Sequence, residues 1–230
     1  MSLAVVYSRA LAGLDAPLVR VEVHVGGGLP QTNIVGLPEK EVRESRDRVR
    51  AALSTAHFAR PDGRVTVNLA PADLPKESGR FDLPIAIGIL AATGQVPSKP
   101  LEHLEFAGEL GLSGELRPIR GALAMTYRAH RDGRAFVLPH CVAQEAAITR
   151  GATVFPARTL LDVCGHLAGK SPLAPYVPER RIDEPTYADL ADVRGQAQAR
   201  RALEIAAAGS HSLLILGPSE PPRMTAKLTT

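Results

Sequence analysis

The chain has 230 residues, of which 45% are hydrophobic and 22% are charged, a balance that predicts a packed core and excludes a disordered chain. Its formal net charge of +3 excludes a strong positive field over the whole molecule, so nucleic-acid binding would have to rest on a local basic patch. The absence of tryptophan and an aromatic content of 4% argue against a stacking platform for single-stranded nucleic acid.

The start of the sequence and its cysteines favour a cytoplasmic protein. Residues 1–3 carry no basic side chain, and Arg9 and Asp15 interrupt the apolar stretch that follows, unlike a signal peptide. No run reaches the roughly 20 apolar residues of a membrane span. Cys141 and Cys164 are too few for a disulfide framework. We therefore expect a cytoplasmic chain with no membrane partner.

Alternating apolar residues predict the first strands. Valines at every second position of residues 19–25 indicate a strand with one buried face, and residues 32–35 can form a second strand after a glycine-rich turn. A helix is expected to begin near Pro38 and to run to about Leu53. Alternation over residues 65–69 predicts another strand. These early strands suggest antiparallel pairing.

The middle of the chain alternates helices with strands. Asp82 is expected to cap a helix from Leu83 to Ala92, which is apolar on nearly every side and should therefore be central. Further strands are predicted over 106–112, 115–117 and 135–138 and up to residue 155, and further helices over 122–130 and 160–167. The fold class is α+β, grading into α/β.

A proline-rich segment divides the chain. Four prolines between residues 170 and 185 cannot continue a helix or a central strand, so we expect a semi-rigid linker at 171–186. It would separate a first domain, residues 1–170, from residues 187–230. The second part holds a predicted helix, 197–208, and the apolar run 213–216, which is typical of the buried strand before a phosphate-binding loop.

The phosphate-binding loop itself is degenerate. After Gly217, Pro222 stands where a second glycine should lie, Arg223 where a lysine should lie, and Met224 where Ser or Thr should hold magnesium. The prolines remove backbone donors, so this chain is expected to use no ATP or other cofactor. Two hypotheses account for the patternless residues after 220: a frameshift or truncation, and an ordinary solvated tail after a strand unrelated to nucleotides.

Several motifs closely resemble the ComM/YifB family, whose members are often labelled magnesium chelatase-like. The most specific is the stretch Asn68-Leu69-Ala70-Pro71-Ala72-Asp73-Leu74-Pro75-Lys76-Glu77, followed by Arg80-Phe81-Asp82-Leu83-Pro84. Further matching segments are residues 1–3, 35–38, 46–50, 108–110 and 193–196. The resemblance covers residues 1 to about 218.

The resemblance implies a Lon-protease-like domain of the ribosomal S5 domain 2-like fold, followed by the start of an α/β AAA+ module. Intact members resemble homo-hexameric motors that use ATP and magnesium to drive branch migration of DNA during natural transformation. Branched or single-stranded DNA is the implied partner. By the same resemblance Val193, Gly195 and Gln196 would lie against adenine, and Gly217 would open the phosphate loop of an ATP site that is not functional here.

The Lon resemblance raises a Ser-Lys peptidase as an alternative. Alignment with the Lon motifs puts Arg80 at the nucleophile position and Leu123 at the lysine position, and neither side chain can perform the chemistry. A slipped pair of Ser78 and Lys76 is conceivable, although Ser78 fits a polar turn and Lys76 a surface position. We predict no catalytic residue. A magnesium chelatase subunit, which would need ATP and a porphyrin-binding partner, is a third hypothesis.

Basic residues give two candidate DNA contacts. Lys76, Arg80, Arg117 and Arg120 lie on two loops that the Lon resemblance brings together, and they predict a positive patch there. The helix over 39–53 carries Arg43, Arg46, Arg48 and Arg50 mixed with acidic residues, which indicates a solvated, salt-bridged face or one that meets DNA or a subunit.

A metal site is not expected. His140-Cys141 and Cys164-Gly165-His166 together contain four potential zinc ligands, but neither has the usual Cys-x-x-Cys spacing. Cys164 lies on the apolar face of its predicted helix and fits a small buried residue better.

Overall fold

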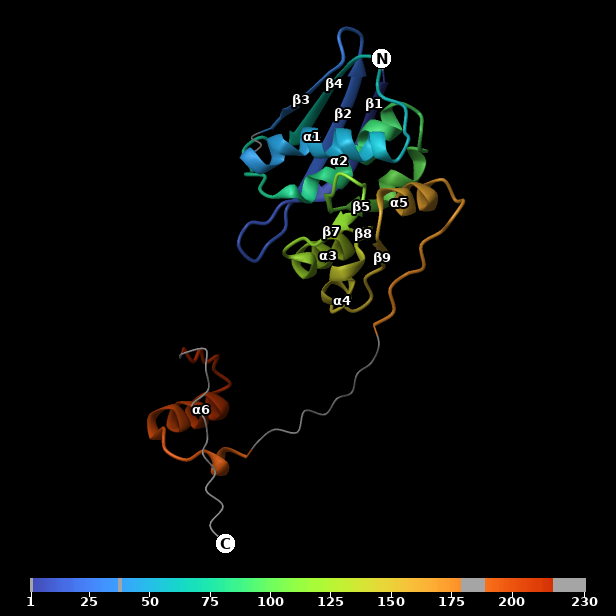
Figure 1. The fold of residues 1–230 in the computed structure, drawn as a ribbon. Helices are drawn as coiled ribbons and strands as arrows, with labels where there is room; N and C mark the ends of the chain where they lie inside the picture. The colour runs from blue at the N-terminus through green and yellow to red at the C-terminus, as the bar shows by residue number, and fades with distance from the viewer. Residues whose placement is uncertain (1, 37–38, 179–188, 217–230) are drawn as a thin grey trace. The chain divides into compact units, whose positions relative to one another are not determined.

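The computed structural model describes residues 2–36, 39–178 and 189–216 (Figure 1). The chain divides into two compact units, Met1–Glu179 and Arg180–Thr230, and each is described by itself. The predicted helix start at Pro38, the second half of the predicted linker and the phosphate loop lie outside the described residues.

The first unit is built on a seven-stranded mixed sheet of order β3-β4-β2-β1-β5-β8-β9. Its strands are β1 (Ser2–Arg9), β2 (Leu18–Gly26), β3 (Gln31–Val35), β4 (Arg64–Ala70), β5 (Leu104–Phe106), β8 (Ala135–Pro139) and β9 (Val154–Ala157). Strand β2 pairs antiparallel with β1 and β4, and the other neighbours are parallel. The predicted mixture of helices and strands is confirmed. Strand β3 pairs with β4 in parallel and not with β2, because β4 lies between β2 and β3.

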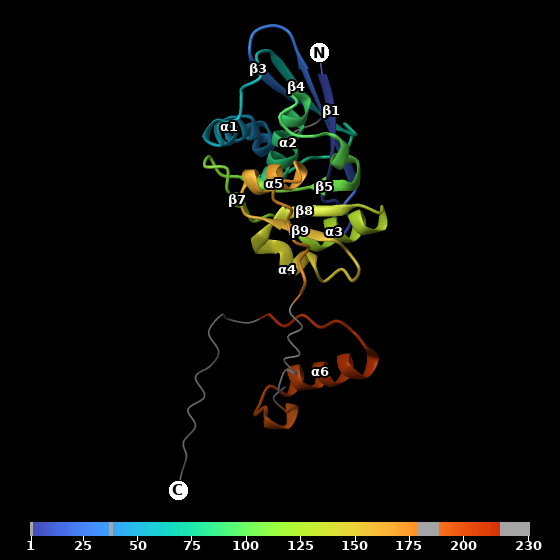
Figure 2. The same ribbon diagram turned by 90° about the vertical axis from the view of Figure 1, so that its right-hand side faces the viewer.

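Helices pack against the centre of the sheet as well as against both of its ends. They are α1 (Lys40–Thr55), α2 (Asp82–Ala92), α3 (Ala122–Arg131), α4 (Ala143–Ala146) and α5 (Leu160–Leu167). Figure 2 shows α1 near β3 and β4, and α3 and α4 near β8 and β9. A short hairpin of β6 (Glu109–Leu110) and β7 (Leu116–Arg117) lies outside the main sheet.

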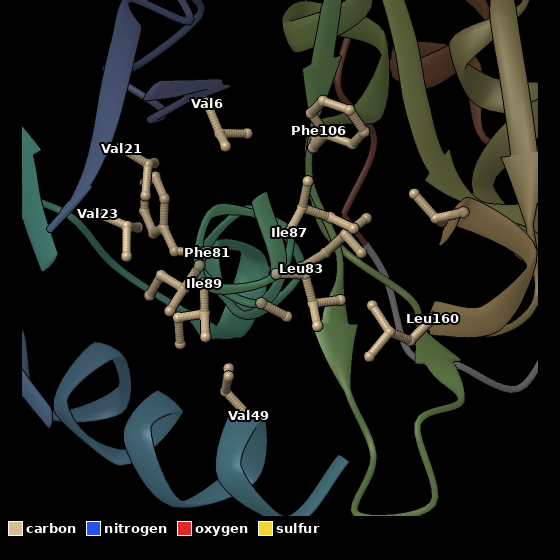
Figure 3. Close-up of a cluster of buried hydrophobic side chains, with 14 of the residues drawn as sticks. Val6, Val21, Val23, Val49, Phe81, Leu83, Ile87, Ile89, Phe106 and Leu160 are labelled. Carbon is tan, nitrogen blue, oxygen red and sulfur yellow. The ribbon is translucent and has the colours of Figure 1, made fainter. Parts of the chain in front are cut away.

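Helix α2 is the centre of the larger core, as its uniformly apolar sequence predicts. Its side chains meet Val6, Val21 and Val23 of the sheet, while Val49 of α1 approaches from the other side (Figure 3). The prediction that Asp82 caps this helix is wrong: the cap residue is Phe81, and no side-chain capping bond is present. Asp82 is instead buried and bonded to Arg48 of α1.

The first part of the proline-rich segment belongs to the first unit. The Tyr176 amide donates to the Val154 carbonyl (2.8 Å), on the outer edge of β9. The Leu173 amide donates to Nδ1 of His166 at 3.1 Å. Leu173 and Tyr176 also pack against the two hydrophobic cores. Residues 170–178 therefore lie fixed on this unit without forming a helix or a strand.

In the second unit, helix α6 (Ala197–Gly209) matches the predicted helix. The prediction of a buried strand over 213–216 is wrong for this chain, because these residues form no strand and Leu214 and Leu216 are 80% and 84% exposed. An isolated strand has no partner for its backbone groups, and residues 189–216 contain no other strand.

Candidate functional site

Lys76 is buried in the loop that follows β4. Its side chain is 0% exposed, and its ammonium group donates a hydrogen bond to the Pro71 carbonyl. Burial lowers the pKa of Lys76 below its ordinary value. The expectation that Lys76 is a surface residue is therefore wrong, because the polar loop that carries it folds back over the side chain.

Arg80 is also buried, on the short turn Gly79–Phe81 that leads into α2. Its Nε donates to Ser78 Oγ at 2.9 Å, and its Nη1 lies 3.7 Å from the sulfur of Met125. Desolvation lowers the pKa of Arg80. Ser78, with φ 63° and ψ 169°, occupies a backbone region that is essentially restricted to glycine. The backbone is thus strained two residues before Arg80, which the Lon resemblance puts at the nucleophile position.

The four predicted DNA-contact residues do not share one surface. Lys76 and Arg80 are buried, whereas Arg117 and Arg120 are exposed. Arg117 lies 3.8 Å from Glu109 and 3.4 Å from Glu115, so nearby carboxylates offset its charge. The patch predicted from sequence is therefore reduced to two exposed arginines. Arg120 lines an open hollow whose other charged residues are Arg48, Glu39, Glu77 and Glu109.

The same loop offers no activated serine. The Ser78 hydroxyl accepts its hydrogen bond from Arg80, while Lys76 donates to a backbone carbonyl, so the described contacts do not join the two. Leu123, at the lysine position of the Lon pattern, is an apolar residue on α3. A Ser-Lys dyad needs a lysine that accepts the serine proton directly.

The arginines of α1 divide between two surroundings. Arg48 turns inward, where its Nε and Nη2 donate to Asp82 at 2.7 and 3.1 Å. Arg46 and Arg50 are exposed and line a cleft together with Arg60. Arg43 lies outside the described side chains. The helix is therefore not a uniform salt-bridged face, and sequence periodicity missed Arg60 because it lies beyond the helix.

The described residues of the predicted ATP site are exposed. Val193 is 39% exposed, and Gly195 and Gln196 are exposed in left-handed backbone conformations. No residue between 189 and 216 is buried, so nothing there encloses an adenine ring. Gly217, with the rest of the phosphate loop, lies outside the described residues.

His140-Cys141 and Cys164-Gly165-His166 carry the four potential zinc ligands noted in the sequence. Among the described residues no group of three or more His, Cys, Asp or Glu side chains is placed to hold an ion. Cys141 is exposed and Cys164 is buried, and burial raises the pKa of Cys164 to about 12. In the part of the chain that the structure describes, no helix is long and apolar enough to cross a membrane.

Comparison with known families identifies the chain. The family model described as subunit ChlI of Mg-chelatase matches residues 21–141, more than half of the chain, and a second model for magnesium chelatase subunit ChlI matches residues 189–225. The chain belongs to the magnesium chelatase ChlI-like family of ComM and YifB proteins. The family expectation from the sequence motifs is confirmed.

Relatives match this ComM/YifB-family chain along nearly its whole length. Competence protein ComM of Haemophilus influenzae is 50% identical over 223 residues, which cover 95% of this chain and 44% of the relative. YifB of Escherichia coli is 44% identical over 218 residues, covering 95% and 43%. Rv2897c of Mycobacterium tuberculosis is 41% identical over 219 residues, covering 95% and 44%. The chain thus spans less than half the length of these relatives.

Proposed function

We propose that this chain is the N-terminal part of a ComM-type AAA+ motor that drives branch migration of DNA during natural transformation. The observation that carries the proposal is the 50% identity to a protein named for competence, over 95% of the chain. In this proposal residues 1–170 form a Lon-like scaffold of the ribosomal S5 domain 2-like fold that engages DNA. Residues 171–186 are the linker, and residues 187–230 begin the ATPase module.

The Lon-like domain would work without peptidase chemistry. Arg80 and Leu123 occupy the two dyad positions, and Ser78 has a guanidinium group rather than an amine as its partner. Arg80 stays protonated and cannot take the serine proton, so its contact with Ser78 does not activate the hydroxyl for attack.

The motor activity would belong to intact, homo-hexameric members in the cytoplasm, which bind ATP and magnesium. Pro222, Arg223 and Met224 replace the glycine, lysine and hydroxyl residue of a phosphate loop, so this chain itself would bind DNA without hydrolysing ATP. Arg117 and Arg120 are exposed and are candidate contacts to the DNA backbone.

The proposal is tested by titrating the chain with labelled single-stranded, duplex and four-way-junction DNA, with and without ATP and magnesium. We expect binding that weakens with salt and does not respond to ATP, together with no ATP hydrolysis. Failure to bind any of the three DNA forms at low salt would contradict the proposal. Casein cleavage that disappears in the Ser78→Ala variant would favour the peptidase instead.

A further inference from the structure

A cleft at the β3 end of the sheet gathers three exposed arginines. Arg46 and Arg50 extend from α1, and Arg60 extends from the loop between α1 and β4. Gln31 and Thr32 of the edge strand β3 form the opposite side. The cleft lies at the end of the sheet where Figures 1 and 2 show α1 beside β3 and β4.

The floor of this cleft is apolar. Beneath the arginines it reaches Val49 and Leu53 of α1, Val65 of β4, and Ile85 and Ile89 of α2. All five are buried members of the main hydrophobic core. Because these side chains are only 0–6% exposed, they close the base of the cleft, and a ligand would contact the guanidinium groups and polar side chains at its rim.

The loop that carries Arg60 is held rigidly. The Gln95 side chain accepts from the Ala59 amide at 2.8 Å and donates to the Ala59 carbonyl at 3.0 Å. Further along, a Cβ atom on Gly63 would lie 1.9 Å from the Gly26 carbonyl oxygen, so this close approach requires glycine. A wall fixed in this way loses little entropy when a ligand binds.

The arginine donors are weakly occupied. Arg60 donates to the neutral Ser54 hydroxyl at 3.3 and 3.1 Å. Arg46 pairs with its exposed neighbour Asp47 at 3.2 Å, a kind of pair that contributes little in water. Three arginines face two cleft carboxylates, those of Asp47 and Asp62, which leaves an excess of positive charge.

We propose that this cleft binds the phosphodiester backbone of single-stranded DNA, with phosphates on Arg46, Arg50 and Arg60. Arg46 and Arg50 are four residues apart and lie on one face of α1, so they can contact successive phosphates. A flexible single strand can bend so that its phosphates follow a positively charged groove of this kind. This site rests on the proposed function and replaces the loop patch as its main DNA contact.

The test is fluorescence anisotropy of a labelled oligothymidylate with the full 230-residue chain at several salt concentrations. In the double variant Arg50→Gln/Arg60→Gln we expect a roughly 2- to 30-fold weaker affinity, the range for two exposed ion pairs. The slope of log K against log salt should shrink by about 0.7 for each phosphate that the variant no longer binds. The matched control Arg131→Gln/Arg150→Gln removes two exposed arginines near α3 and α4 and should bind as the unmodified chain does.

A second variant separates position from charge. Gln95→Ala keeps every arginine but removes both hydrogen bonds that hold Ala59, next to Arg60, in place. It should therefore weaken DNA binding at constant net charge. Unchanged thermal melting of the two double variants, followed by circular dichroism, shows that they remain folded.

The outcomes distinguish the site from the function. If Arg50→Gln/Arg60→Gln and Gln95→Ala both bind the oligonucleotide as tightly as the unmodified chain does, the cleft proposal is wrong while DNA binding stands. A weakening found only in Arg117→Gln/Arg120→Gln would have the same meaning. If the unmodified chain binds no DNA, both proposals fail. If oligoglutamate of equal charge competes as well as the oligonucleotide, the cleft is an acidic-peptide site and the DNA assignment is overturned.

Discussion

A buried ion pair between Arg9 and Glu105 gives the sharpest stability prediction. Nε and Nη2 of Arg9, at the end of β1, donate to the two carboxylate oxygens of Glu105 in β5 at 2.6 and 2.7 Å. Nη1 of Arg9 donates to the Ala16 carbonyl at 3.0 Å, and Asp132 accepts from Nη2. Glu105 is fully buried, and its other cation, Arg134, lies 3.4 Å away.

Replacing Arg9 by Met should destabilise the chain much more than removing both charges. The single variant leaves the Glu105 carboxylate buried with a long contact to Arg134, and stranding a buried charge costs about 3–5 kcal/mol. The double variant Arg9→Met/Glu105→Leu leaves no buried carboxylate, and well-packed apolar replacements of buried pairs are often close to neutral. We therefore expect the double variant to be more stable than Arg9→Met.

The measurement is urea unfolding at pH 7, followed by circular dichroism. It compares the unmodified chain with Arg9→Met, Glu105→Leu and the double variant Arg9→Met/Glu105→Leu. The free energy of unfolding is compared at an unchanged m value, so that differences report the native state. A cost of Arg9→Met below about 1 kcal/mol, the value of an exposed pair, would refute the stranded buried charge. Costs of the two single variants that simply add in the double variant would refute it as well.

Three further predictions concern single residues. Ser78→Gly should be more stable than Ser78→Ala by about 1–2 kcal/mol in the same urea assay, because both remove the hydroxyl but only glycine relieves the positive φ. Burial lowers the pKa of His166, whose Nδ1 accepts from Leu173, so this hydrogen bond stabilises the fold above pH 6.5 and breaks as pH falls through the lowered pKa. Exchange of the Leu173 amide, corrected for its intrinsic rate, should accelerate on acidification, and His166→Phe should abolish that pH response. Iodoacetamide should modify Cys141 in the native chain and Cys164 only after unfolding, since burial raises the pKa of Cys164 to about 12.

Each of these has a contradicting result. An Ala variant at position 78 as stable as the Gly variant would exclude backbone strain there. A pH response that survives His166→Phe would assign it to another group. Equal labelling of the two cysteines under native conditions, read by mass spectrometry of the peptides, would contradict the burial of Cys164.

The strongly patterned elements were predictable from the sequence. Alternating valines identified β2, and the apolar character of residues 83–92 on every side identified α2 as central. Both signals are local, because they depend only on the period of the element. Strand β1 was not predicted, although its Val6 is a buried core residue, because residues 3–7 form a continuous apolar run without the alternation that marks a strand.

The errors arose where tertiary contacts override local preference. Asp82 occupies a favourable capping position, but it is buried, and both of its oxygens accept hydrogen bonds from the half-buried Arg48 of α1, 34 residues earlier in the chain. Lys76 follows a proline in a polar loop, and nothing local indicates that its side chain is covered. The cleft likewise needs Arg60 to meet Arg46 and Arg50, a proximity created by the fold.

DNA engagement by the first unit is the proposal on which the cleft depends, and photocrosslinking tests it without any substitution. An oligonucleotide with photoreactive thymidine analogues is crosslinked to the full chain, and the attached peptides are identified by mass spectrometry. We expect crosslinks within residues 1–179, concentrated between 30 and 63 around the arginine cleft. Crosslinks confined to residues after 179, or none above background when the oligonucleotide is in excess, would contradict DNA engagement by this unit.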